Sequence, residues 1–196
     1  QYRRDIQKVL HSLHGGNAEE VKKRRACLKK MLMDKSLNLE TWEKGLIIHA
    51  FADSFAHTQA DGSAYKSGSG HAKDGTSPDI ITNRPELYKE YTKELFEALG
   101  GTNYDTNSQM KKMKELVDGL VKKKSDSAQS ISNQIAFHDY YQGRDNYKLL
   151  NQDLKDYDPR KGKEVLGKKL DGGKWRKNKK DVQSLINKIK KYCDCK

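Results

Sequence analysis

The chain has 196 residues, of which 34% are hydrophobic and 34% are charged, and its formal net charge at pH 7 is +12. This length suits one domain with a modest hydrophobic core. No apolar run approaches the roughly 18 residues of a membrane span, which argues against a transmembrane protein. The positive charge favours a polyanionic partner, either nucleic acid or anionic lipid, although a solvated lysine-rich surface would give the same composition.

The first helices are expected on either side of a double glycine. The apolar spacing predicts helices over Arg4–Leu13 and Ala18–Met33, separated by Gly15-Gly16. Asn17 is a suitable N-cap, because acidic residues follow it and basic residues end the helix. A third helix, over Leu39–Thr58, is the most apolar stretch of the chain.

The remainder of the chain also favours helices. Gln59–Ser77 is rich in glycine and serine and predicts a long loop, followed by a short helical turn that begins at Pro78. Asn83 is expected to cap the next helix. Further helices are expected over Glu86–Leu99, Gln109–Lys124, Ser130–Tyr141 and Lys180–Tyr192, the last with Val182, Leu185, Ile186 and Ile189 facing inward.

No stretch alternates long enough for a strand, and no internal repeat is visible. The predicted fold is therefore all-α. Residues 1–143 are expected to form a helical-bundle domain with a metal site and a long Gly/Ser-rich active-site loop, and residues 144–196 a basic extension packed on it.

The three cysteines are Cys27, Cys193 and Cys195. Their spacing fits neither a zinc finger nor a redox motif. Two of them lie at the chain end, where residues are usually frayed. Unimportant thiols are therefore expected in preference to a disulfide or a metal-binding role.

The apolar third helix carries ionisable residues at intervals of four. His49, Asp53 and His57 lie in "GLIIHAFADSFAHT" and would form one narrow stripe on a helix. An unpaired carboxylate or imidazole among apolar neighbours is costly. A metal ion would satisfy all three side chains, and a hydrogen-bonded ladder between helices is the structural alternative.

Zinc fits this donor set best, with manganese or magnesium as alternatives. His49 and His57 would lie roughly 12 Å apart along the helix axis, too far for one ion to bind both comfortably. Two or three ions are therefore expected, with Asp53 between them. Ions about 3.5–4 Å apart suit phosphodiester hydrolysis.

Further ligands must come from other segments. His71 is expected as a ligand because flanking glycines free the backbone in "SGSGHAKDGTSPD". His11, in "VLHSLHGG", lies on a helix face expected to point inward, whereas His14 is expected to be exposed. Asp74 and Asp79 are candidates for a ligand, an orienting group or a general base, or are ordinary turn residues.

These segments resemble the C-terminal toxin domains of Rhs-type bacterial polymorphic toxins. There, a helix with H-x-x-x-D-x-x-x-H precedes a segment with G-H-x-x-D-G-x-x-P-D and N-R-P, as in "GSGHAKDGTSPDIITNRPELYKEY" here. The "LHSLHGG" segment looks like their "LHxLTGG", with His14 in place of threonine. The resemblance covers about residues 5–95.

More distantly, the helix is similar to the H-x-x-x-D motif of the zinc-dependent phospholipase C and fungal single-strand nuclease superfamily. Its members are all-helical phosphodiesterases with three zinc ions. His49 and Asp53 match that motif, and His57 and His71 match later histidines. The family places the histidine at His57 two residues further on, and Gly75 stands where it has glutamate.

The resemblance implies roles for the candidate residues. His11, His49, Asp53, His57 and His71 would bind metal. The candidate catalytic residues are Asp74 and Asp79, which would steer the attacking water, and Arg84, which, like Lys73, would pair with the phosphate.

The expected function is a metal-dependent phosphodiester hydrolase that acts as an antibacterial toxin domain. Nuclease activity is favoured slightly over phospholipase C activity, because lysines and arginines cluster over residues 161–180. The chain is expected to be secreted or delivered as the C-terminal part of a larger toxin, with an acidic immunity protein as partner. The alternatives are a basic module that binds nucleic acid without catalysis, and a domain stabilised structurally by metal.

Overall fold

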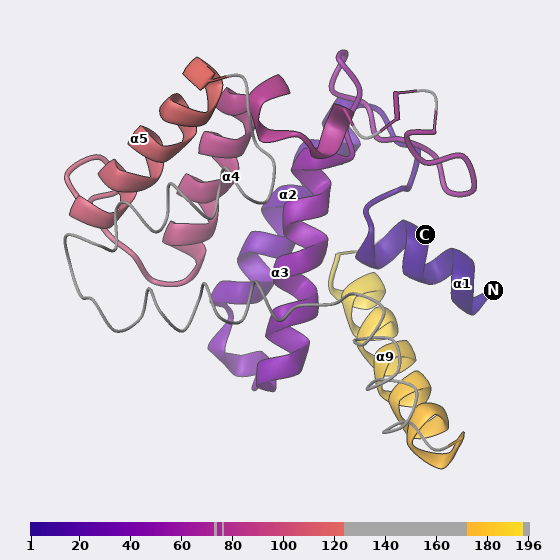
Figure 1. The fold of residues 1–196 in the computed structure, drawn as a ribbon. Coiled ribbons are helices and arrows are strands. Elements are labelled where there is room, and N and C mark those ends of the chain that lie inside the picture. Colours follow the sequence, from indigo (N-terminus) through magenta and orange to yellow (C-terminus); the bar gives the residue numbers. More distant parts are fainter. Residues whose placement is uncertain (73, 76, 124–171, 194–196) are drawn as a thin grey trace.

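Two helices form the centre of the fold, namely α2 (Ala18–Met33) and α3 (Thr41–Ala56), joined by a short 3-10 turn. The computed structural model describes residues 1–72, 74, 75, 77–123 and 172–193, apart from the side chains of residues 79, 123 and 172–178. On one side of this pair lie α4 (Pro85–Ala98) and α5 (Ser108–Lys123) (Figure 1). On the other side lie the short α1 (Tyr2–Asp5) and the long α9 (Gly172–Tyr192) (Figure 1).

No strand occurs in the described part of the chain, which contains only two isolated β-bridges, His14 with Lys66 and Thr58 with Ala64. The predicted all-α class is confirmed. None of the helices in these same ranges is long and apolar enough to cross a lipid bilayer. The predicted helix over Ser130–Tyr141 and the predicted boundary between residues 143 and 144 lie outside the described residues.

The start of α2 follows its sequence signals closely. The Asn17 side chain accepts a hydrogen bond from the Glu20 amide at 3.0 Å, and the Glu20 carboxylate accepts one from the Asn17 amide at 2.8 Å. This reciprocal capping satisfies two amides that the helix leaves unpaired. The predicted bounds of α2 are confirmed.

The predicted helix over Arg4–Leu13 is wrong in its last three residues. After α1 the chain forms a π-helical turn, η1 (Ile6–Leu10), and then leaves the helix. Ser12 adopts φ +51°, a left-handed conformation that a right-handed helix cannot continue. His11 therefore lies just beyond the helix end.

The predicted cap at Asn83 is also wrong. Arg84 is the N-cap of α4, since Pro85 occupies the first helical position, where its missing N–H costs no hydrogen bond. The side-chain Nδ2 of Asn83 instead donates to the Ser77 hydroxyl at 2.9 Å. Two 3-10 turns, η3 (Ser77–Asp79) and η4 (Ile81–Asn83), precede α4, and the first matches the turn predicted at Pro78.

The hydrophobic core lies where α2, α3, η1 and α9 meet. Leu28 and Met31 of α2 face Ile47 and Phe51 of α3, and all four are almost fully buried. The predicted inward residues of α9 are confirmed, because Leu185, Ile186 and Ile189 are completely buried and Val182 packs at the edge. Burial of this apolar surface supplies the main stabilisation of the fold.

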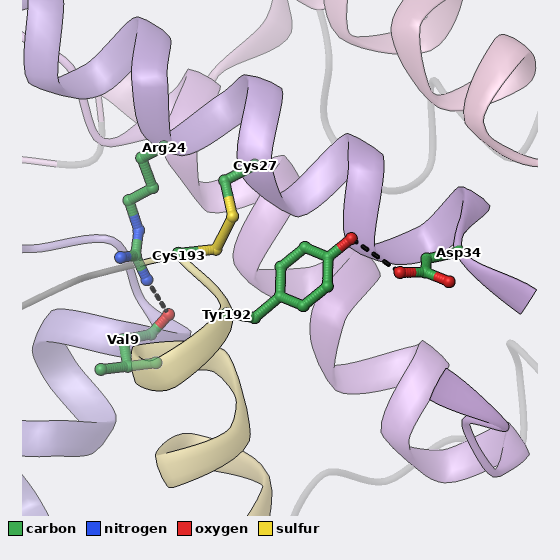
Figure 2. The surroundings of a disulfide bond; sticks show 6 residues. All are labelled: Val9, Arg24, Cys27, Asp34, Tyr192 and Cys193. Atoms are coloured by element: carbon green, nitrogen blue, oxygen red, sulfur yellow. Dashed lines mark hydrogen bonds between the residues drawn. A yellow bond between two sulfur atoms is a disulfide. The ribbon is translucent and has the colours of Figure 1, made fainter. Parts of the chain in front are cut away.

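The expectation of unimportant thiols is wrong for two of the cysteines. Cys27 of α2 and Cys193, which follows α9, form a disulfide (Figure 2). The sulfur atoms meet because α9 packs against α2, a tertiary contact that cysteine spacing does not encode. Next to the disulfide, the Tyr192 hydroxyl donates to Asp34 at 2.9 Å (Figure 2).

His14 is half-buried rather than exposed, because the segment after η1 folds back onto the loop at Lys66. Gly15 allows this approach with φ +74°, and a Cβ there would lie 2.7 Å from Cγ of Lys66. The His14 Nδ1 accepts a hydrogen bond from the Gly16 amide at 3.2 Å. Burial, with the nearby Arg24 charge, lowers the pKa of His14 to about 4.

Removing the disulfide is expected to destabilise the fold. The bond closes a loop of 166 residues, so its loss restores much entropy to the unfolded chain. The variant with Cys27→Ser and Cys193→Ser should lose about 3–5 kcal/mol of unfolding free energy in urea titrations. Cys195→Ser is the matched control and should unfold like the wild type. Equal stability of all three proteins would contradict the disulfide.

His14 should make stability depend on pH. Its folded pKa lies below the unfolded value of about 6.5, so the unfolded chain binds more protons between these pH values. Stability should therefore be full above pH 6.5 and fall by about 1–3 kcal/mol as pH drops toward 4. His14→Asn, which keeps an acceptor for the Gly16 amide, should remove that part of the slope. An unchanged slope in denaturant titrations would refute this role of His14.

Candidate metal centre

The helix α3 presents its polar stripe at the edge of the core. The side chain of His49 is 46% exposed, whereas that of Asp53 is only 15% exposed. The opposite face of α3 buries Ile47, Phe51 and Phe55. The sequence predicted a helix buried on several sides, but α3 leaves this one edge open to solvent.

Two local features carry His11 to the same edge. The Ser12 hydroxyl, buried beneath the turn, donates to the carbonyl of Ala50 at 2.8 Å. His57, the C-cap of α3, donates from Nδ1 to the carbonyl of His11 at 2.7 Å. The chain after η1 is therefore held against α3 at two points, Ala50 and His57, which lie about two helical turns apart. This places the His11 ring beside Asp53.

One oxygen of Asp53 lies among three imidazole rings. Its Oδ2 is 2.9 Å from Nδ1 of His11, 3.4 Å from Nε2 of His49 and 3.5 Å from Nδ1 of His57. The facing nitrogens of His11 and His49 are 3.3 Å apart. One ligand atom from each of His11, His49 and Asp53 lies within 4.8 Å of the others, and we call these three residues the His/Asp group.

The carboxylate of Asp53 affects the protonation of its neighbour. The hydrogen bond to Asp53 raises the pKa of His11 above its usual value, although partial burial acts in the opposite direction. Without a metal, an Nδ1–H of the His11 ring would donate to the carboxylate, and the charge of Asp53 favours the protonated ring. A proton on His11 or a metal ion at this place would balance the charge of Asp53.

The Gly/Ser-rich loop brings a second set of predicted residues close to the first. The His71 ring lies 5.2 Å from the His57 ring, between centroids, and its Nδ1 is 2.5 Å from the carbonyl of Gly75. The Tyr65 hydroxyl donates to the carboxylate of Asp74. The Tyr65 ring also meets His71 edge to face at 5.9 Å.

Tyr65 is a residue that the sequence reasoning missed. Its side chain is buried, and burial together with the bond to Asp74 raises the pKa of its hydroxyl. The only signal was one large aromatic residue in a loop otherwise made of small and polar residues, "GSAYKSGSG". Tyr65 anchors this loop, so that His71 lies over His57.

Arg84 binds main-chain carbonyls and also interacts with the Tyr65 hydroxyl. Its Nη1 donates to the carbonyl of Ala56 at 3.2 Å and also to the carbonyl of Thr58. Ala56 is the last residue of α3, so its carbonyl lacks a partner within the helix, and Thr58 follows the C-cap His57. Arg84 therefore secures the helix end beside His57. The predicted roles of Lys73 and of the Asp79 side chain fall outside the described residues.

A cavity of about 260 Å³ adjoins the His/Asp group between α3 and α4, and Asp53 and Arg84 contribute to its wall. Its lining is otherwise mainly apolar and aromatic, and includes Phe55, Ile80, Ile81, Leu87, Tyr88 and Tyr91. Burial raises the pKa of both tyrosine hydroxyls, which stay protonated and able to donate. Pockets that bind whole drug-sized ligands usually span about 300–1,000 Å³, so this one suits a single ring-sized group.

No family model, no curated protein and no solved structure matches the chain. The resemblance to Rhs-type toxin domains therefore rests on the sequence motifs alone. The geometry around Asp53 is independent of that resemblance.

Replacing the carboxylate should change the titration of its neighbour. Asp53→Asn removes the negative charge that stabilises protonated His11, so the pKa of His11 in metal-free protein should fall toward its usual value. Titration of the histidine ring signals by NMR would measure the shift. Asp74→Asn is the control, since Asp74 bonds Tyr65 instead. A His11 pKa that is the same in wild type and Asp53→Asn would disprove the contact.

Proposed function

We propose that the protein is a metal-dependent phosphodiester hydrolase whose metal is held by the His/Asp group. The observation that carries this proposal is the convergence of three ligand atoms from His11, His49 and Asp53 within 4.8 Å. Two imidazole nitrogens and one carboxylate oxygen are a common ligand set of catalytic zinc.

The distances support a single shared ion. Zinc bonds of about 2.0–2.2 Å in tetrahedral geometry separate neighbouring ligand atoms by about 3.3–3.6 Å. The three separations here are 2.9, 3.3 and 3.4 Å. The side chains of His11 and His49 are 42% and 46% exposed, so the solvent side has space for water or a substrate oxygen. A structural metal site would instead enclose the ion with protein ligands.

Neighbouring residues would keep these ligands in place. The bond from His57 to the His11 carbonyl fixes the backbone that carries one ligand. The ring of His71 covers His57 on its loop side. A zinc ion bound at this edge would lower the pKa of a water molecule and neutralise charge on a phosphoryl oxygen. Asp74, bonded to Tyr65, would hold the loop rather than act directly on water.

Charge and cavity size favour nucleic acid over phospholipid as the substrate. The net charge of +12 attracts a phosphate backbone. The cavity beside Asp53 has space for one ring, and Tyr88 and Tyr91 in its wall offer aromatic surface for stacking a base. Two acyl chains need far more apolar space than about 260 Å³. Nuclease activity is therefore our first proposal, and phospholipase C activity the second.

The biological role proposed is that of a toxin domain. The motifs that resemble Rhs-type toxin domains include His49, Asp53 and His71. The Cys27–Cys193 disulfide is consistent with an extracellular protein. A cognate immunity protein with an acidic surface would complement the basic charge of this chain.

Metal content tests the proposal first. Wild-type protein purified without chelators or a histidine tag should contain about one zinc ion per chain by elemental mass spectrometry. Asp53→Ala should lose the metal and at least about a hundredfold of hydrolase activity, because one ligand and its charge are gone. Asp118→Ala, which alters an exposed aspartate of α5 paired with Lys89 of α4, is the matched control. Asp53→Asn provides a second variant if the alanine variant does not fold.

Substrates are screened side by side. Single-stranded DNA, RNA and phosphatidylcholine vesicles are incubated with zinc-loaded protein, and cleavage of nucleic acid but not of lipid is expected. Hydrolysis of vesicles alone would select the phospholipase C alternative. A folded wild type that takes up neither zinc nor manganese would refute the hydrolase and leave a nucleic-acid-binding module, tested by salt-dependent binding.

A further inference from the structure

The C-terminal helix α9 is packed against the segment that leads into His11. Leu185, Ile186 and Ile189 are completely buried and share one apolar cluster with Val9 and Leu10 of η1. His11 is the next residue along the chain. The position of one member of the His/Asp group therefore depends on a helix more than 160 residues away in sequence.

Ion pairs attach α9 to both chain segments that supply the His/Asp group. Lys190 lies 2.8 Å from the buried carboxylate of Asp5, which precedes η1. Lys188 lies 2.6 Å from the buried carboxylate of Glu43, in the first turn of α3. A buried carboxylate that loses its partner is strongly destabilising, so these pairs favour an attached α9.

Helix α2 is also bonded to η1 and to the end of α9. Arg24 donates from Nη2 to the carbonyl of Val9 at 2.6 Å (Figure 2). One turn further along α2, Cys27 is bonded to Cys193 beyond the end of α9 (Figure 2). The disulfide thus adds a covalent link to the contacts among α2, α9 and η1. Residues 124–171 separate α5 from α9 in the sequence, and the disulfide adds a covalent link between α9 and α2.

We propose that the Cys27–Cys193 disulfide is a redox control on metal binding, which rests on the proposed function of the His/Asp group. Both cysteines are partly exposed, so a small dithiol can reach them. Attack by the dithiol breaks the S–S bond, converts the reductant to its own disulfide, and leaves two protonated cysteines. The apolar face of α9 and the pairs of Lys188 and Lys190 still hold the helix, but its end detaches more often. η1 is then covered less firmly, and His11 lies beside Asp53 for less of the time.

Hydrogen–deuterium exchange tests the coupling without relying on metal. Wild-type protein is compared before and after reduction with a water-soluble phosphine, which becomes its oxide. Reduction should raise exchange in residues 6–12 as well as in residues 182–193. Faster exchange confined to residues 182–193 would overturn the proposal. Ile189→Ala, which loosens α9 without removing a sulfur, should also raise exchange in residues 6–12.

Zinc titration measures the consequence at the site. The comparison uses Cys195→Ser and the triple variant with Cys27, Cys193 and Cys195 all changed to serine, so that no free thiol binds zinc. The triple variant should bind zinc about tenfold to a hundredfold more weakly, as expected when support of a ligand is lost. Equal affinity in both proteins would overturn the redox control.

The two proposals fail in different ways. If the oxidised protein binds no zinc, the proposed function is refuted, and redox control of a metal site is refuted with it. If zinc binds equally with and without the disulfide, the proposed function stands and only the redox control fails. If Cys195→Ser alone abolishes the response to reduction, Cys27–Cys193 is the wrong bond and the assignment is overturned.

Discussion

The carboxylate of Asp53 is the group on which the arrangement of the site depends. It lies at the boundary between the core and solvent, with its Oδ2 between 2.9 and 3.5 Å from three imidazole rings. A nearly buried negative charge must be balanced locally by a cation or by hydrogen bonds. Two chain segments provide the imidazoles beside Asp53. Helix α3 provides His49 and its C-cap His57, and the turn after η1 provides His11.

The rest of the structure can be understood as support for this convergence. The Ser12 hydroxyl and the His57 ring bind the turn to α3, and Arg84 secures the carbonyls at the end of α3. Helices α2 and α9 pack against η1 on its other side. Mostly main-chain and apolar contacts thus hold the residues that surround Asp53. These contacts do not use the ring nitrogens of His11 and His49 that face each other and the solvent.

The sequence was informative where the signal is local. The capping residues of α2 and the four-residue spacing on α3 predicted those helices and the shared stripe of His49 and Asp53. Features that depend on tertiary contacts could not be predicted from the sequence. Helical periodicity continues past Leu10, but Ser12 adopts a left-handed conformation and its hydroxyl bonds the carbonyl of Ala50. Cysteine spacing does not encode the packing of α9 on α2, and His57 turns its Nδ1 to a carbonyl that only the fold brings near.

The disulfide also links the stability of the fold to the redox state of its surroundings. In a reducing cytoplasm the chain would have free Cys27 and Cys193, because glutathione and thioredoxin keep such thiols reduced. The packing of α9 on α2 would then lack its covalent link. An oxidising compartment would close the bond and give the fold its full stability. The same sequence would thus have two levels of stability, set by the compartment that holds it.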